Sequence, residues 1–444
     1  MMLGTKGSGS VAESGSEKFV TPAHYRAPPP SEQNMANPLR VAFLGKLDAV
    51  MLADGWQRGK CDTCGVTFYS MGQRLGNCGS EFCSNQSLCF QAGDAKSPIT
   101  IEALMKKMRD HFVGDGYTSL DPRPVLHWRG KSGEKQLDES LFTVAVVQMF
   151  DEMMFEEKEV DVAKRKIFSW QPAIRLIMRD QISRDKGFYS SFVNVATESV
   201  NPTPEEHVAD VISWMKFLSE VMEKQNLSMK VYDHVLDWYG RKSPTVHIFF
   251  AYKSFELGDS GYHYAFPQST RQPLVFSDIG FGLERIAWCA NKTVRNFDMV
   301  GPLTESVNDN IQLMDRTRTL ALLIGSNITP SDTPYGMKVR SLVRDLVAAD
   351  GDALRWHTLV PYYYKFWSYF TKLQLGPTQI REVIRDEVNR QRNGQLAAEL
   401  KLSISGDDAK APTYEFVEKC IAGGFGKRIP LDRIEKALGG LKRQ

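Results

Sequence analysis

Four residues in the stretch FSDIGFGLERIAW, residues 276–288, could act together on a charged ligand. Arg285 carries a planar guanidinium that matches phosphate oxygens, and Asp278 offers an anion to an ammonium group. Gly280 and Gly282 have no Cβ, so a ligand or another backbone segment can approach closely. An anion beside a phosphate-binding cation indicates a ligand with an amine and a phosphate. The plain structural alternative is a strand–turn–helix connection with a surface ion pair.

The elements around this stretch must bring the four residues together. The segment PLVF, residues 273–276, has the composition of a strand. The spacing of Leu283, Ile286 and Ala287 is helical, so a helix is predicted to begin near Gly282. A helix N-terminus presents free N–H groups and a partial positive charge. Asp278 is therefore expected at the end of the strand, facing the same place.

The composition is that of an ordinary globular protein. The chain has 444 residues, enough for two or three domains, with 42% hydrophobic and 24% charged residues. Its net charge of +2 gives no overall basic field that would demand nucleic acid. No apolar run approaches the roughly 20 residues that span a bilayer, and the polar N-terminus lacks a signal-peptide pattern. We therefore expect a cytoplasmic protein with no membrane partner.

The cysteines predict a metal site. In CDTCGVTFYSMGQRLGNCGSEFC, Cys61 and Cys64 form one close pair and Cys78 and Cys83 form another. Two such pairs suit a tetrahedral Zn²⁺ site with four thiolate ligands. Cys89 is a spare candidate ligand. The alternative is a small apolar cluster of four buried free thiols.

Four regions follow one another along the chain. Residues 1–39, rich in Gly, Ser and Pro, are expected to form a flexible tail. Residues 40–95 form the Cys-rich module that is expected to bind zinc. Residues 96–305 mix strand and helix patterns, and residues 306–444 are mostly helical. The layout indicates an α+β protein with a helical C-terminal part.

Several elements can be located by periodicity and capping. One helix is predicted after Thr100 as N-cap. Another is predicted after Thr203, where Pro204 takes the first turn and Glu206 closes a capping box with Thr203. The segment VHIFFAY, residues 246–252, alternates like a strand. The acidic run of residues 151–161 is interpreted as the solvated face of a helix.

Two further stretches carry a family resemblance. The first is SWQPAIRL, residues 169–176, with Phe192 seventeen residues after Arg175. The second is DRTRTLALLIGSNITPSDTPYGMKVRSLVRDLV, residues 315–347. Together with SDIGFGLERIAW, they resemble the catalytic fragment of alanyl-tRNA synthetase of the archaeal type, a class II aminoacyl-tRNA synthetase. The resemblance implies an antiparallel sheet flanked by helices in residues 96–305. It also implies that residues 306–444 correspond to the domain that recognises the tRNA acceptor.

By this resemblance, five residues bind ATP: Arg175, Phe192, Gly282, Glu284 and Arg285. The two arginines are the catalytic candidates, one on the α-phosphate and the other on the distal phosphates. Phe192 stacks on adenine. Asp278 holds the substrate ammonium, and Gly280 keeps the floor of the amino-acid site open. The implied reaction joins an amino-acid carboxylate to the α-phosphate of ATP and releases pyrophosphate, with Mg²⁺ shielding the phosphates.

The sequence departs from the family around the first of these motifs. Acidic and amide residues that follow the arginine in the family are replaced by Ile177 and Met178. A basic position becomes Phe188, and a glutamate becomes Val193. Each change removes a polar contact expected to ATP or to the tRNA end. The stretch that shapes the amino-acid pocket reads GRKSPTVHI, residues 240–248, so the pocket is expected to be altered; its His247 is interpreted as a hydrogen-bonded, half-buried residue.

The helical region departs as well. An asparagine that reads the acceptor stem in the family is Asp332 here, and an acid tends to repel phosphate. Arg340 and Arg344 lie one turn apart and could contact a nucleic-acid backbone, although paired arginines on a helix usually form a solvated face. The family's editing centre and C-terminal domain have no counterpart in this sequence.

These departures give three functional hypotheses. The leading one is an adenylate-forming ligase that activates a small amino acid, with alanine as the first candidate. It would transfer the acyl group to a non-tRNA small molecule or carrier in specialised, antibiotic-type metabolism. The first alternative is a minimal synthetase that charges tRNA(Ala) without editing. The second is a non-catalytic paralogue that binds an amino acid, a nucleotide or tRNA.

Overall fold

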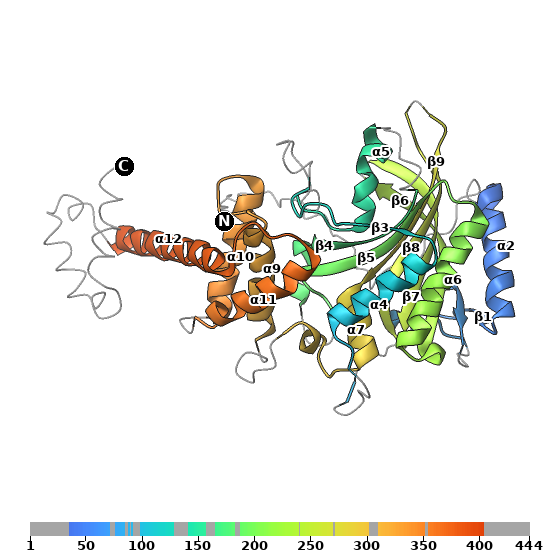
Figure 1. Cartoon of the computed structure of the whole chain (residues 1–444), viewed down its shortest axis with the longest axis horizontal. Coiled ribbons are helices and arrows are strands. Elements are labelled where there is room, and N and C mark those ends of the chain that lie inside the picture. Colours follow the sequence, from blue (N-terminus) through green and yellow to red (C-terminus); the bar gives the residue numbers. More distant parts are fainter. Residues whose placement is uncertain are drawn as a thin grey trace, which may run out of the picture.

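A nine-stranded sheet forms the centre of the molecule (Figure 1). The computed structural model describes residues 35–403 apart from the segments 72–75, 85–87, 89, 92–97, 128–140, 157–164, 183–186, 239, 270, 302–309 and 351–353. The strand order is β1-β2-β6-β7-β8-β9-β5-β4-β3. Every neighbouring pair is antiparallel except β3 and β4, which are parallel. The strands are β1 Gln57–Lys60, β2 Thr67–Ser70, β3 Thr118–Leu120, β4 Lys166–Ile174, β5 Ser191–Val200, β6 Leu227–Trp238, β7 Arg241–Tyr252, β8 Phe255–Phe266 and β9 Leu274–Gly282.

Helices flank the sheet, so the expected α+β class with a mostly antiparallel sheet is confirmed. The helices of the sheet region are α2 Pro38–Ala53, α3 Glu81–Ser84, α4 Ile101–Gly114, α5 Asp151–Glu156, α6 Pro204–Val221 and α7 Leu283–Asn291. Short 3₁₀ helices are η4 Val146–Phe150, η6 Leu176–Gln181, η7 Lys224–Asn226 and η8 Asn296–Met299. None of the described helices is both long and apolar enough to cross a membrane.

One face of the sheet is covered by α4 and α6, with α2 packed on α6 (Figure 1). The Trp214 ring of α6 stacks on Phe281 of β9 with centroids 4.3 Å apart, and Phe112 of α4 lies 4.4 Å from Trp214. The predicted helix starts are confirmed: the Thr100 hydroxyl accepts from Ala103 N–H, and Thr203 forms the capping box. The aromatic rings of these helices therefore hold the sheet from one side.

The C-terminal helices gather at one end of the sheet, and α12 projects away from it (Figure 1). They are α9 Ile311–Gly325, α10 Pro334–Asp350, α11 Trp356–Phe370 and α12 Pro377–Ser403. The helical character predicted for this region is confirmed as far as the structure describes it. Trp170 of β4 donates its indole N–H to the Phe370 carbonyl at 2.9 Å, which ties α11 to the sheet.

The structure corrects two local predictions. β9 continues through Gly282, so Asp278 lies in mid-strand and not at a strand end, because β9 is paired on both sides, with β5 and β8. The acidic run is not simply a solvated helix face: Asp151 is fully buried, and its carboxylate lies 3.0 Å from the His127 ring.

Two observations concern the predicted division of the chain into four regions. β1 and β2 of the Cys-rich segment belong to the same sheet as the rest, since β2 pairs with β6. The first described helix α2 begins at Pro38 with Asn37 as N-cap. Residues 1–34 of the predicted tail and the spare ligand Cys89 lie outside the described residues. The four-region division stays a prediction.

Candidate active site and cysteine cluster

The sheet face that α4 and α6 leave uncovered carries the predicted substrate residues. Side chains alternate between faces along a strand, and Phe281 and Ile279 of β9 are buried on the helix side. Asp278 and Gly280 therefore point to the opposite side. We call this side the open face.

Two carboxylates meet on the open face across the β5–β9 pair. Glu198 is the direct register partner of Asp278. Glu198 is fully buried, and neither of its oxygens makes a hydrogen bond of ordinary geometry within the described residues. Burial and then the charge of Asp278 raise the pKa of Glu198 well above its usual range. Burial and the nearby Asp259 raise the pKa of Asp278 to about 7.

Arg285 stands in the first turn of α7, as predicted. Its guanidinium lies between two aromatic rings, 5.6 Å from the centroid of Phe188 and 5.5 Å from that of Phe255. Nε donates to the Gly187 carbonyl at 3.2 Å, and Nη1 lies 3.5 Å from a Glu256 carboxylate oxygen. The arginine head is thus oriented by its surroundings and still 22% exposed, which suits contact with an anion.

Arg175 follows the last residue of β4. Its guanidinium carbon lies 5.1 Å from the centroid of the Phe192 ring, and Nη2 donates to the Val144 carbonyl at 3.1 Å. Arg175 and Phe192, which the resemblance associates with the α-phosphate and the adenine of ATP, are therefore in contact at the end of the β4–β5 hairpin. The side chain of Arg175 is exposed.

Asp259 of β8 interacts electrostatically both with the two arginines and with Asp278 of the carboxylate pair. It lies beside Gly280 in the sheet register. The side chain of Asp259 is 53% exposed, so desolvation can raise its pKa only weakly, and the hydrogen bond from His247 at 2.9 Å and the charges of Arg175 and Arg285 lower it. Both arginines therefore act on the same carboxylate.

His247 is hydrogen bonded at both ring nitrogens. It contacts Tyr232 at 2.8 Å as well as Asp259. The interpretation of His247 as a hydrogen-bonded, half-buried residue is confirmed.

Glu284 occupies a different environment from its neighbour Arg285. Its carboxylate is fully buried, accepts the Val193 N–H at 3.0 Å, and is paired with Arg318 of α9. Arg318 in turn donates to the Ser191 carbonyl at 2.7 Å. A direct contact of Glu284 with ATP stays a prediction; the observed contacts give it a role in holding β5, α7 and α9 together.

The two glycines leave limited space above the strand. A Cβ at Gly280 would lie 3.4 Å from the Asn194 amide nitrogen and 3.7 Å from an Asp278 oxygen. A Cβ at Gly282 would lie 3.3 Å from the Arg285 side chain. Both positions therefore border residues of the candidate site, and a methyl group at either would stand next to them.

The loop after Arg175 contacts the helical region. Arg179 donates to the Ser341 hydroxyl at 3.2 Å and lies 3.6 Å from Asp345 of α10. Phe188 takes the place of the family's basic residue and gives Arg285 an aromatic surface. Of the departures noted in the sequence, Phe188 therefore has a side-chain partner, while Ile177 is exposed.

The three candidate acceptor contacts, Asp332, Arg340 and Arg344, differ in exposure and in ion pairing. Asp332 is 95% exposed and is paired with Arg340. Arg340 also lies 4.0 Å from Glu387 of α12, so two acids neutralise it. Arg344 is exposed. Of the two arginines on α10, only Arg344 is exposed and without an ion pair among the described residues.

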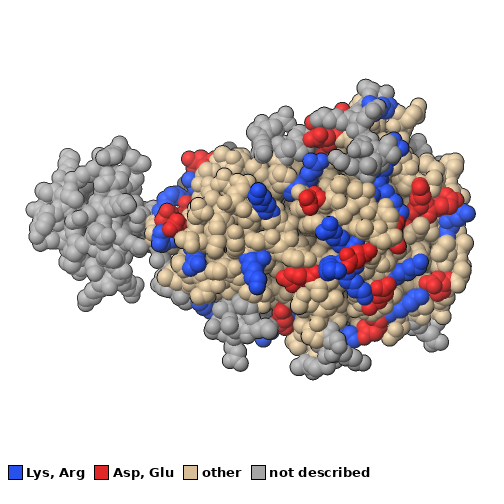
Figure 2. Space-filling model, in the orientation of Figure 1, with Lys and Arg blue, Asp and Glu red and all other residues tan. Residues whose placement is uncertain are grey.

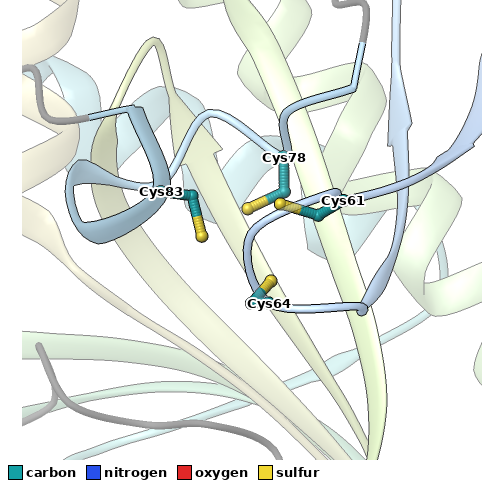
Figure 3. Close-up of side chains that lie close together, drawn as sticks. All are labelled: Cys61, Cys64, Cys78 and Cys83. Atoms are coloured by element: carbon teal, nitrogen blue, oxygen red, sulfur yellow. The ribbon is translucent and has the colours of Figure 1, made fainter.

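The four predicted cysteines meet in one cluster (Figure 3). All four sulfur atoms lie within 4.8 Å of one another, whereas four thiolates at about 2.3 Å from one Zn²⁺ lie about 3.8 Å apart. Gly65 and Gly79 follow Cys64 and Cys78 with φ of +72° and +77°, a conformation that favours glycine and turns the chain around the cluster. The donor set and its spacing therefore fit zinc, which would hold the β1–β2 hairpin to α3.

The fold agrees with the class that the sequence resemblance implies. The sheet is mostly antiparallel and flanked by helices, with one arginine at a hairpin end and a second on the helix after a DIGFG strand, as expected for a class II aminoacyl-tRNA synthetase-like fold. Two solved pyrrolysyl-tRNA synthetases of Desulfitobacterium hafniense are similar in fold. They give TM-scores of 0.32 and 0.31 at 11% and 12% identity, covering 46% and 45% of this chain and 75% and 70% of theirs. These superpositions are loose.

Among curated proteins, the chain is distantly homologous to alanine–tRNA ligases over about 55% of its length. The ligase of Staphylothermus marinus is 23% identical over 259 residues, which are 55% of this chain and 27% of the relative. That of Methanosphaera stadtmanae is 21% identical over 381 residues, 82% of this chain and 41% of the relative. The chain thus spans between a quarter and two fifths of the length of these relatives. No protein-family model matches it.

Some site residues were not found from the sequence. Glu198 lies in the segment VATESV, which has no motif, and only the β5–β9 register places it opposite Asp278. Asp259 likewise enters the site through the β8–β9 register. Arg318 belongs to the DRTRTL stretch that carries the resemblance, but its burial against Glu284 has no local signal.

Proposed function

We propose that the protein activates an amino acid with ATP as the aminoacyl adenylate and transfers the aminoacyl group to tRNA. The observation that supports this proposal is that the charges of Arg175 and Arg285 both act on Asp259, which in turn acts on Asp278. Two cations for phosphate oxygens and one carboxylate for an ammonium group are what adenylate formation requires. The distant homology to alanine–tRNA ligases supports the same reaction and makes alanine the first candidate substrate.

In the proposed reaction a carboxylate oxygen of the amino acid attacks the α-phosphorus of ATP. A new O–P bond forms, and the bond from the α-phosphorus to the oxygen that leaves with pyrophosphate breaks. Arg175 would stabilise charge that develops on the α-phosphate, with Phe192 beside it for the adenine ring. Arg285, oriented by Phe188 and Phe255, would hold the distal phosphates. Asp278 would fix the ammonium so that the carboxylate faces the phosphate.

Mg²⁺ would neutralise the phosphates in this reaction. Besides the four cysteines, no group of three or more possible metal ligands gathers among the described residues. The ion would therefore be bound mainly by the phosphates, as Mg²⁺ often is. Asp259 and Glu256 of β8 are the carboxylates nearest to the two arginines in the contacts described above.

Amino-acid-dependent ATP–pyrophosphate exchange without tRNA tests the activation step. All standard amino acids are compared, with Ala, Gly and Ser first. Exchange with one of them is the expected result and identifies the substrate. If no amino acid supports exchange, with or without added tRNA, the proposal is wrong and the alternative of a non-catalytic binding protein gains support.

A non-tRNA acceptor is the second candidate for the transfer step. One observation favours it: Asp332 and Glu387 neutralise Arg340, so part of the expected acceptor surface offers no free cation. Aminoacylation of total tRNA, with the identified amino acid at physiological salt, distinguishes the two. Charged tRNA supports the first proposal; exchange without charging supports a small molecule or carrier. None of the comparisons relates the chain to antibiotic-type metabolism.

We further propose that Cys61, Cys64, Cys78 and Cys83 bind one structural Zn²⁺. A metal assay on the purified chain is expected to give about one equivalent. Removal by a chelator should lower the thermal stability because the β1–β2 hairpin loses its link to α3. Less than half an equivalent in freshly purified protein would contradict the zinc assignment and favour free thiols.

A further inference from the structure

Glu198 presents a physical problem that its surroundings do not solve. A fully buried carboxylate without a hydrogen bond is unfavourable unless it is neutralised. Its register partner across the sheet is a second carboxylate, Asp278, on the same face. Two such groups cannot both be ionised at close range. A proton shared between them supplies the missing hydrogen bond in the free protein.

The charged groups around the pair come from several elements. β8 contributes Asp259, whose negative charge disfavours a second anion. β7 contributes His247 and the end of β4 contributes Arg175, which favour the ionised form of Asp278. η4 and α5 cover the neighbouring part of the face, packing on Ala196 and Phe276, and the buried acid there is paired with His127.

We propose that Glu198 and Asp278 together form a two-carboxylate receptor for the ammonium group of the substrate. The pair shares one proton in the free protein and releases it to solvent when the amino acid binds. The incoming ammonium then supplies the donors and the positive charge that the proton supplied before. This inference rests on the proposed activation of an amino acid and adds Glu198 as a substrate-binding residue.

The charge balance sets the pH dependence. Free protein carries one negative charge on the pair, and the complex carries two beside one ammonium. One proton must therefore leave for each amino acid bound wherever the pair is singly protonated. Over that range, affinity for the amino acid should rise about tenfold per pH unit. Near neutrality the increase should level off, since burial and Asp259 raise the pKa of Asp278 to about 7.

Titration calorimetry in buffers of different ionisation enthalpy measures the released proton directly. The probe is the amino acid that supports exchange, bound between pH 5.5 and 8 in the presence of a non-hydrolysable ATP analogue. Wild-type protein should release close to one proton at pH 6. Glu198→Gln should release far less, with weaker binding whose pH dependence is nearly flat. Glu198→Asp keeps a carboxylate and should restore most of the proton release.

Asp210→Asn is the matched control, because Asp210 is also a buried acid but is bonded to Tyr117 and Ser199 on the other side of the sheet. It should keep the wild-type proton release. Equal proton release by wild type and Glu198→Gln, or none by wild type that supports exchange, overturns the inference while the proposed function stands. If wild-type protein neither supports exchange nor binds any amino acid, the proposed function fails and the inference with it.

Discussion

The two faces of the sheet solve opposite problems. On the helix side, Trp214 stacks on Phe281 and donates its indole N–H to Thr197 at 2.7 Å, so this side chain is both packed and hydrogen bonded. On the open face, Glu198 and Asp278 are brought together although their charges repel. The first face contributes stability through burial. In the proposed function, the second keeps groups whose favourable partner is the substrate.

Figure 2 adds the outer surface of the helix-covered side to this comparison. Lys, Arg, Asp and Glu are interspersed there, and no large area carries one sign of charge. Such a surface offers little attraction to a polyanion. If tRNA is the acceptor, we therefore expect it to approach from elsewhere.

The largest expected effect on activity comes from the open face. Arg285→Ala removes the cation proposed for the distal phosphates, and we expect ATP–pyrophosphate exchange to fall by about 10²–10³-fold. Stability should change by less than about 1 kcal/mol, since the side chain is partly exposed and its interactions are cation–π contacts, backbone hydrogen bonds and a partly exposed ion pair with Glu256. Arg385→Ala on α12 is the control, because that side chain is 58% exposed. Undiminished exchange in Arg285→Ala would sink the site assignment.

A substitution on the covered face should have the opposite effect and lower stability without lowering activity. Trp214→Phe leaves a cavity and removes the hydrogen bond to Thr197, so the free energy of unfolding should fall by about 2 kcal/mol. The exchange rate of the folded protein, measured well below its melting temperature, should stay near that of wild type. Urea unfolding and exchange assays on the same preparation test this. A large loss of exchange with unchanged stability would mean that the two faces are not separate in function.

The elements of the covered face could be predicted from the sequence more completely than the residues of the open face. The helices α4 and α6 follow directly from their caps and from the spacing of apolar residues such as Leu104 and Met108, because helix signals are local. The four-cysteine cluster is local too. Glu198 and Asp278 are 80 positions apart, and only strand register brings them together. Periodicity predicts which residues share a face of a strand, but it cannot choose the neighbouring strand.

Family resemblance supplied part of what local patterns could not. It pointed to Arg175, Arg285 and Asp278, and in the structure the charges of both arginines act on Asp259, a neighbour of Asp278. It did not foresee that Glu284 is buried against Arg318, because that pairing depends on how α9 docks on the end of the sheet. The residue types of a motif alone therefore do not separate a residue that would contact a ligand from one that supports the fold around it.

A smaller effect is expected from filling the floor of the open face. Gly280→Ala places a methyl group 3.7 Å from an Asp278 oxygen without a backbone clash. We expect the protein to fold with normal stability and the KM for the amino acid to rise about tenfold, because the ammonium is displaced from its carboxylate. Gly45→Ala on α2, where the added Cβ meets nothing within 4 Å, is the control. An unchanged KM would place the amino acid elsewhere.

The smallest effect concerns stability of the ligand-free protein. The pKa of Glu198 is higher in the folded than in the unfolded chain, so the folded state holds more protons and loses stability as pH rises from about 4 toward neutrality and above. Glu198→Gln removes this penalty. At pH 8 the variant should be more stable than wild type by roughly 1 kcal/mol, and the difference should shrink by pH 5. Urea unfolding at the two pH values measures it. A Gln variant that is less stable than wild type at pH 8 would show that other groups of the protein already neutralise Glu198. In that case the open face would not hold an unfavourable carboxylate, and the two faces would not differ in this respect.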